Sequence, residues 1–124
     1  MSKIGYFRRQ HSLFLCQHFD ISINGIDYYN SHNVGFEFKE TYSPYEKNKF
    51  FKIPLKQVKI ADYFVFCENT SNFFIVESRE IRNRYTFKNK RKKANIRINV
   101  VKQMAIFHTK YIEILKKMIE MIKE

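Results

Sequence analysis

The chain has 124 residues, which is enough for one domain with a single hydrophobic core and too few for two such cores. Its 23 Lys and Arg residues face only 12 Asp and Glu residues, and the net charge of +11 indicates a polyanionic partner, with nucleic acid as the first candidate. The three glycines are too few and too scattered for a phosphate-binding loop of the Walker or Rossmann type, which disfavours a nucleotide-dependent enzyme.

No stretch approaches the length of a transmembrane helix, and the N-terminus lacks a signal-peptide pattern. We therefore expect a soluble, cytoplasmic protein with no membrane partner. Cys16 and Cys67 lie far apart in apolar runs, which predicts buried free thiols. The sequence has no clustered set of zinc ligands.

Residues 1–19 join a basic start to an apolar run and predict an amphipathic helix. Arg8 and Arg9 would lie at its surface, where they contact either phosphate or only solvent. Residues 20–41 predict a three-stranded meander. A strand at Ile21–Ile23 is followed by the turn Asn24–Gly25, and the turn formers Asn30–Asn33 separate a second strand from a third.

The third of these strands, residues 34–40, has two different faces. Because side chains alternate in a strand, Phe36 and Phe38 point one way while Glu37 and Lys39 point the other. Gly35 is expected to leave open space beside them. Antiparallel pairing with residues 26–29 would bring Asp27 close to this second face. Two carboxylates suit Mg²⁺, and a lysine beside them can orient water or stabilise charge on a phosphate.

At these residues the chain resembles the PD-(D/E)XK nuclease superfamily, which includes restriction endonucleases and archaeal Holliday-junction resolvases. The family pattern is an acidic residue, a short hairpin and then Asp/Glu-any-Lys on a strand, met here by Asp27 and Glu37-Phe38-Lys39. The likeness covers roughly residues 20–80. Two features depart from the pattern: residues 1–19 contain no acid, although many members carry a Glu on the first helix, and Ile26 stands where a proline often precedes the Asp.

The resemblance implies a restriction-endonuclease-like α/β fold, a mixed β-sheet flanked by helices, as a single domain over residues 1–124. It also implies a Mg²⁺-dependent endodeoxyribonuclease in which Mn²⁺ can replace Mg²⁺. Asp27 and Glu37 would hold the metal, Lys39 would assist the water, and Gln57 matches a catalytic-site Gln on the following helix. Glu-any-Lys alone is a weak signal, because strands often carry such a pair as a solvated, salt-bridged outer face.

After the site strand, residues 42–53 read as a polar loop, and Pro54 is placed to start a short helix over residues 54–61. Residues 63–67 and 73–76 are apolar on both faces, with a turn between them, and predict central strands covered by helices. We expect residues 96–100 to form the last strand and residues 102–123 a long helix. Its last turns, with Met118, Ile119, Met121 and Ile122, would form a homodimer seam.

Residues 79–93 hold the densest positive charge, with aromatic residues interleaved, and predict contact with nucleic acid; a flexible, solvated loop would show the same pattern. The predicted contact residues in this segment are Arg82, Arg84, Lys88, Lys90, Arg91, Lys92 and Lys93.

The sequence thus favours a DNA endonuclease, with branched (Holliday-junction) DNA as a candidate substrate and a small restriction or homing endonuclease as a rival. Two non-enzymatic functions also fit the charge pattern. One is a basic nucleic-acid-binding module without catalysis, and the second is an assembly protein that docks on an acidic partner.

Overall fold

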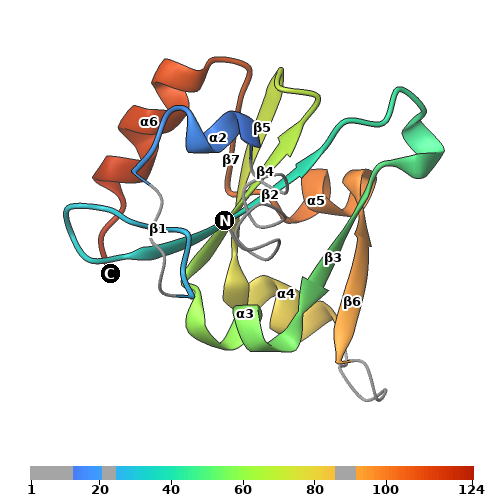
Figure 1. The fold of residues 1–124 in the computed structure, drawn as a ribbon. Coiled ribbons are helices and arrows are strands. Elements are labelled where there is room, and N and C mark those ends of the chain that lie inside the picture. Colours follow the sequence, from blue (N-terminus) through green and yellow to red (C-terminus); the bar gives the residue numbers. More distant parts are fainter. Residues whose placement is uncertain (1–12, 21–24, 86–91) are drawn as a thin grey trace, which may run out of the picture.

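The computed structural model describes residues 13–20, 25–85 and 92–124. The predicted contact residues Arg8, Arg9, Lys88, Lys90 and Arg91 lie outside these ranges, as does the predicted strand Ile21–Ile23. The described residues form an α/β unit with a mixed sheet flanked by helices (Figure 1), which confirms the coarse fold class.

The main sheet has five strands in the order β1-β2-β4-β5-β7. Among the described strands of this sheet, only β2 and β4 run parallel, and a parallel pair needs a crossover connection. That crossover contains a short 3₁₀ helix (Glu46–Asn48), strand β3 (Phe50–Pro54) and helix α3 (Leu55–Ile60). The strands of the main sheet are β1 (Tyr28–Tyr29), β2 (Gly35–Thr41), β4 (Tyr63–Glu68), β5 (Asn72–Glu77) and β7 (Phe107–Thr109).

Helices α2 (Leu13–Cys16) and α6 (Ile112–Met121) cover one face of this sheet (Figure 1). Leu15 from α2 and Leu115 and Ile119 from α6 are fully buried against the sheet residues Phe36 and Phe38. The two ends of the described chain therefore share one hydrophobic cluster.

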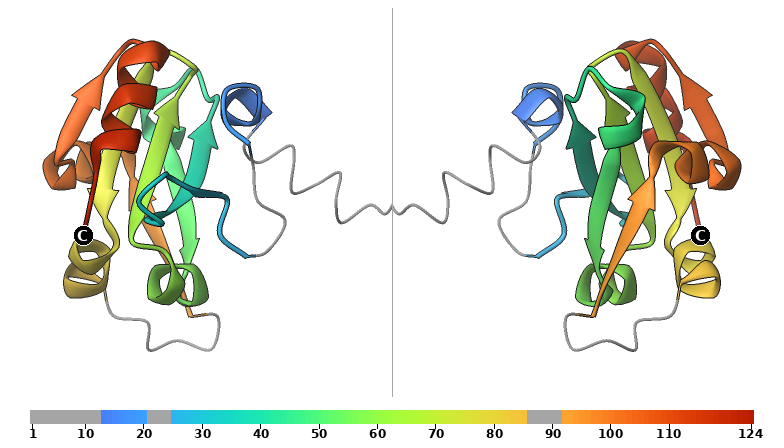
Figure 2. Two further views of the ribbon diagram at one scale, coloured as in Figure 1. Left: turned by 90° about the vertical axis from the view of Figure 1, so that its left-hand side faces the viewer. Right: turned by 90° about the vertical axis from the view of Figure 1, so that its right-hand side faces the viewer.

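The opposite face is covered by a second, two-stranded sheet of β3 and β6 (Lys93–Arg97), together with three short helices (Figure 2). Phe51 and Ile53 of β3 and Ile96 of β6 point inward and are buried in this second cluster. The helices on this face are α3, α4 (Ser78–Arg84) and α5 (Ile98–Met104).

Several predicted elements are confirmed. Helix α3 follows Pro54, and β4 and β5 match the two apolar segments predicted as central strands. Their connecting hairpin bends through Asn69 and Thr70, which both have positive φ angles of 50° and 58°. Cys67 is a buried free thiol, as its apolar surroundings predicted.

The predicted long helix over residues 102–123 is wrong. Strand β6 ends at Arg97, α5 occupies Ile98–Met104, and the chain then forms β7 before α6 begins. The reason lies in β5, whose second edge needs a partner for its backbone groups. Strand β7 supplies that partner, and Ile106 N–H also donates to the Ile75 carbonyl at 2.8 Å.

This break changes the predicted dimer seam as well. Ile119 is fully buried, and Met118 and Ile122 pack against the same cluster, so these three residues stabilise the fold. Met121 is the member of the predicted seam that remains largely exposed. Among the described residues, no helix combines the length and the hydrophobicity needed to cross a lipid bilayer.

Candidate functional site at the β1–β2 hairpin

The register of the β1–β2 hairpin places two carboxylates opposite each other. The strands pair antiparallel with Tyr28 opposite Phe36, and one further step along this register sets Asp27 across from Glu37. Phe38 N–H donates to Asp27 Oδ2 at 2.8 Å, and Asp27 N–H donates to Glu37 Oε1 at 3.2 Å. Each carboxylate is thus held by a backbone amide of the opposite segment.

The alternation predicted for β2 is confirmed. Phe36 and Phe38 are buried beneath α2 and α6, so Glu37 and Lys39 face the side of the sheet that carries the β3–β6 ribbon. The expectation that Gly35 leaves open space beside them is wrong. A Cβ at Gly35 would lie 3.2 Å from Ile26 Cγ2 and 3.3 Å from Tyr29 Cε1.

Glu37 does not lie on a solvated strand face. It is only 2% exposed, and Lys39 is partly buried and forms no salt bridge with the carboxylates of the described residues. Burial, the largest cause, and the neighbouring Asp27 carboxylate together raise the pKa of Glu37 to about 8. Lys39 lowers this pKa, but by less than Asp27 raises it. The site therefore holds an acidic pair whose repulsion the protein does not fully offset.

The ammonium group of Lys39 is affected by the same burial. Desolvation lowers its pKa, the two carboxylates raise it, and the nearby Lys93 lowers it again. Asp27, Glu37 and Lys93 each act electrostatically on Lys39. The structure thus brings together Asp27, Glu37 and Lys39, three of the four residues that the sequence pattern assigned to one site.

The donor set fits a hard divalent cation better than zinc. The described residues contain no group of three or more His, Cys, Asp or Glu side chains placed to hold a metal ion, so the site offers two carboxylates and lacks the four ligands of a structural zinc site. Mg²⁺ keeps several of its waters and commonly uses one or two protein carboxylates. A cation beside Asp27 and Glu37 would also offset the repulsion that raises the pKa of Glu37.

Gln57 lies on α3, as predicted, but the described residues provide no hydrogen bond between it and the acidic pair. Its Oε1 atom is buried without a hydrogen-bond partner among those residues. The neighbouring Val58 is fully buried, so this part of α3 packs into the cluster beneath the ribbon.

Sequence reasoning missed Asp62, which positions the start of the site strand. Its Oδ2 accepts a hydrogen bond from Gly35 N–H at 2.8 Å, and its own N–H donates to the Gly35 carbonyl at 2.9 Å. These bonds join the first residue of β2 to the residue before β4. The only signal in the sequence was an acid directly before an apolar strand.

The predicted basic residues that the structure describes differ in their surroundings. Arg84 pairs with Glu80 at 2.9 Å on α4, and Arg82 donates to the Val58 carbonyl at 3.5 Å. Lys92 and Lys93 lie at the start of β6, where Lys93 is exposed. The arginines of α4 are therefore partly engaged within the protein, whereas Lys93 lies near enough to Lys39 to affect its pKa.

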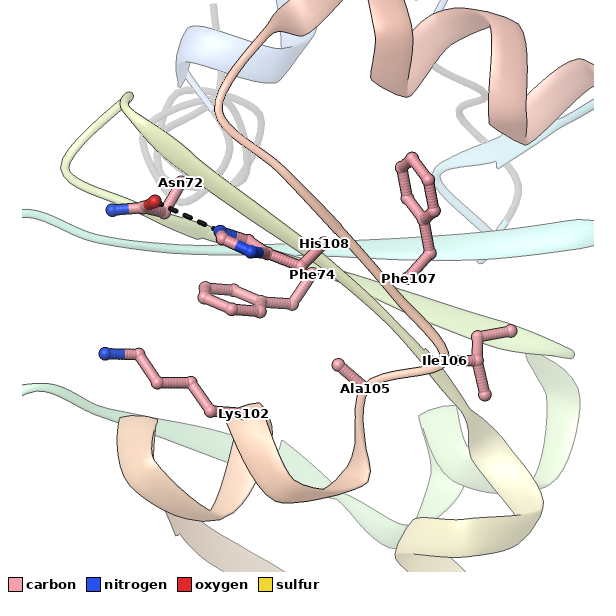
Figure 3. A pocket seen from close by; sticks show the side chains of 7 residues that line it. All are labelled: Asn72, Phe74, Lys102, Ala105, Ile106, Phe107 and His108. Atoms are coloured by element: carbon pink, nitrogen blue, oxygen red, sulfur yellow. Dashed lines mark hydrogen bonds between the residues drawn. The ribbon is translucent and has the colours of Figure 1, made fainter.

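A pocket of about 490 Å³ lies at the opposite edge of the main sheet, beside β7 (Figure 3). His108 stacks on Phe74 there with ring centroids 4.6 Å apart, and its Nε2 lies 3.2 Å from Asn72 Oδ1. His108 falls within the predicted helix over residues 102–123, but it is exposed on a strand. The residues lining this pocket include no carboxylate, so it does not extend the acidic site.

Comparison of the chain with family models, with curated proteins and with solved structures finds no match in any of the three.

The raised pKa of Glu37 predicts how stability depends on pH. Because the folded-state pKa of about 8 exceeds the ordinary value of 4.5, the folded state binds the proton more tightly. The tighter binding of this proton stabilises the folded state in full at pH values below the pKa that Glu37 has in the unfolded state. The stabilisation is lost as pH rises through the pKa that Glu37 has in the folded state. We expect Glu37→Gln to be more stable than the wild type at about pH 8 and to show a smaller difference at about pH 5.

Urea unfolding of both proteins across this range measures the effect. The exposed Glu113→Gln on α6 is a matched control and should follow the wild-type curve. If the free energy of unfolding had the same pH dependence in Glu37→Gln and the wild type, the pKa of Glu37 would not be raised in the folded state.

Proposed function

We propose that the protein is a Mg²⁺-dependent endonuclease that hydrolyses phosphodiester bonds of DNA. The observation that carries the proposal is the register of the hairpin, which sets Asp27 opposite Glu37 with Lys39 on the same face of the strand. Two carboxylates can hold a metal ion that activates water, and a lysine beside them can stabilise negative charge on the phosphate. The net charge of +11 supports a nucleic-acid substrate.

In this proposal Asp27 and Glu37 hold the metal ion through their carboxylate oxygens. When bound, Mg²⁺ supplies positive charge to a phosphate oxygen and lowers the pKa of coordinated water. The backbone bonds from Phe38 to Asp27 and from Asp27 to Glu37 hold both carboxylates in place before substrate arrives. Such preorganisation reduces the rearrangement that the reaction needs.

Lys39 acts on the reacting groups from the same strand face. Its ammonium donates a hydrogen bond either to the attacking water or to a non-bridging phosphate oxygen. Because Lys39 is partly buried, bulk water competes less for its ammonium group. The attraction between this group and the negative charge that develops on the phosphate is therefore stronger. Lys39→Ala should therefore lower the rate of cleavage more than the affinity for DNA.

The proposed nuclease could act on either of two forms of DNA. Branched junctions are one candidate, and duplex DNA cut by a homodimer is another. A homodimer would use the exposed side of α6, where Ile114 and Met121 are accessible together with Tyr111 just before the helix. The predicted residues Met118, Ile119 and Ile122 pack within the protomer and are not available for this role.

The test incubates purified protein with plasmid, single-stranded and four-way-junction DNA, with Mg²⁺ or with EDTA. We expect cleavage only with Mg²⁺, and a loss of about 10²–10³-fold in rate for Lys39→Ala, the scale for removing one preorganised stabilising group. Salt-sensitive binding without cleavage of any substrate would instead indicate a non-catalytic binding module. Cleavage in EDTA would also contradict the proposal.

A further inference from the structure

The β3–β6 ribbon presents an exposed face that sequence reasoning did not identify as a unit. The two strands pair antiparallel over five residues each, and alternate side chains enter the core. The remaining side chains point outward, and we call them the ribbon face. The ribbon face consists of Phe50, Lys52 and Pro54 of β3 and Lys93, Asn95 and Arg97 of β6.

This face carries three positive charges and no carboxylate. Across the strands, Lys52 lies opposite Asn95 and Arg97 lies opposite Phe50. Within the described part of the chain, Lys52 and Lys93 form no salt bridge. The Arg97 guanidinium donates to the Lys47 carbonyl at 3.1 Å, a contact that orients the group without neutralising it.

The charges of the ribbon face differ in this respect from those on α4. There, Arg79 pairs with Glu77 and Arg84 pairs with Glu80, each at 2.9 Å. An anion that approaches α4 must compete with these acids, whereas the ribbon face itself carries no carboxylate.

The ribbon also adjoins the acidic site. Phe51 of β3 packs edge-on against Phe66 of β4 with ring centroids 4.7 Å apart, and Phe66 is the register partner of Lys39. Lys93, at the start of β6, lies close enough to Lys39 to repel it. Of the three cations on the ribbon face, Lys93 is therefore the one that lies within electrostatic reach of the proposed reaction centre.

We propose that the ribbon face binds the phosphate backbone of duplex DNA beside the phosphodiester that is cut, an inference that rests on the proposed function. Lys93 and Arg97 are separated by four residues, which is roughly 13 Å of strand. Along that distance one strand of DNA presents roughly four phosphates. A two-stranded ribbon also has the width that the major groove admits, and the exposed Phe50 and Asn95 accompany the cations on this face.

The test measures duplex binding by the full chain in EDTA, by fluorescence anisotropy at several salt concentrations. Each lost phosphate contact should lower the slope of log K against log salt by about 0.9, so Lys52→Ala/Lys93→Ala should lower it by about 2. The same loss should weaken binding by roughly 30-fold at about 0.15 M salt. The matched control is Lys110→Ala/Lys117→Ala, two lysines beside and on α6, which should keep the wild-type slope.

The outcomes separate this inference from the proposed function. Unchanged slope and affinity in the ribbon variant would overturn the inference, even if the wild type cleaves DNA with Mg²⁺. A reduced slope in a protein that cleaves no substrate would support the ribbon face and overturn the nuclease. Tighter binding of double-stranded RNA than of DNA of the same sequence would contradict duplex DNA as the ligand.

Discussion

The substitution Asp27→Asn should lower the rate of Mg²⁺-dependent DNA cleavage by more than about 100-fold. Loss of a residue that only hydrogen-bonds to a metal ligand already costs up to about 100-fold, and Asp27 would itself be a ligand. The substitution keeps the size of the side chain and an oxygen that can accept the Phe38 N–H bond. It removes one negative charge from the pair that would hold the metal. Glu37→Gln should have a similar effect, because the two carboxylates act together.

Single-turnover cleavage rates at saturating enzyme measure this loss, and DNA affinity in EDTA provides the comparison. We expect affinity to stay within a few-fold of the wild type, since Asp27 and Glu37 do not add positive charge to the binding surface. Glu113→Gln again serves as the control for removal of a carboxylate away from the site. A wild-type rate in Asp27→Asn would show that the assignment of the site is wrong.

The second large effect concerns stability and centres on Asn30. Its buried side-chain amide donates to the carbonyls of Ile119 and Ile122 at 2.7 and 2.8 Å, at the end of α6. Its Oδ1 accepts bonds from the backbone N–H groups of His32 and Val34 at 2.9 and 3.0 Å. One side chain thus joins the β1–β2 turn to the C-terminal helix.

Asn30→Ala should lower the free energy of unfolding by about 3 kcal/mol or more, because each buried polar group left unpaired costs about 1–3 kcal/mol. For a domain of this size the melting temperature should fall by roughly 10 °C. Thermal and urea unfolding check both values. His32→Ala, an exposed position in the same turn, should change stability little; an equally small change in Asn30→Ala would contradict this account.

The acidic pair illustrates a conflict between stability and the proposed activity. Like charges placed directly opposite each other on paired strands destabilise a sheet. Asp27 and Glu37 are placed in this way, and burial raises the pKa of Glu37 to about 8. A sequence selected for stability alone would have little reason to keep both acids, so the arrangement is easier to understand as part of a binding site.

The proximity of Asp27, Glu37 and Lys39 could be predicted because its signals are local. Strand alternation fixes the faces of Glu37 and Lys39, and the turn formers after Tyr29 indicate the hairpin that brings Asp27 across. The apolar runs of β4 and β5 likewise identify buried strands without any knowledge of their partners.

The remaining errors arise where distant pairing decides the structure. Phe107–Thr109 lies within a pattern that also suits a helix, but the free edge of β5 draws it into the sheet. Strand β3 forms within the predicted loop because β6 pairs with it and the core buries Phe51 and Ile53. Neither partner could be identified from the residues of the segment itself.

The most direct test of the central claim is Mn²⁺ binding, because Mn²⁺ can replace Mg²⁺ and is detected by its electron paramagnetic resonance signal. Titration of the wild type, without DNA, should show saturable binding that is lost in the double variant Asp27→Asn/Glu37→Gln. Circular dichroism would verify that the variant is folded. If the folded double variant bound Mn²⁺ as tightly as the wild type, these two carboxylates would not be the metal site.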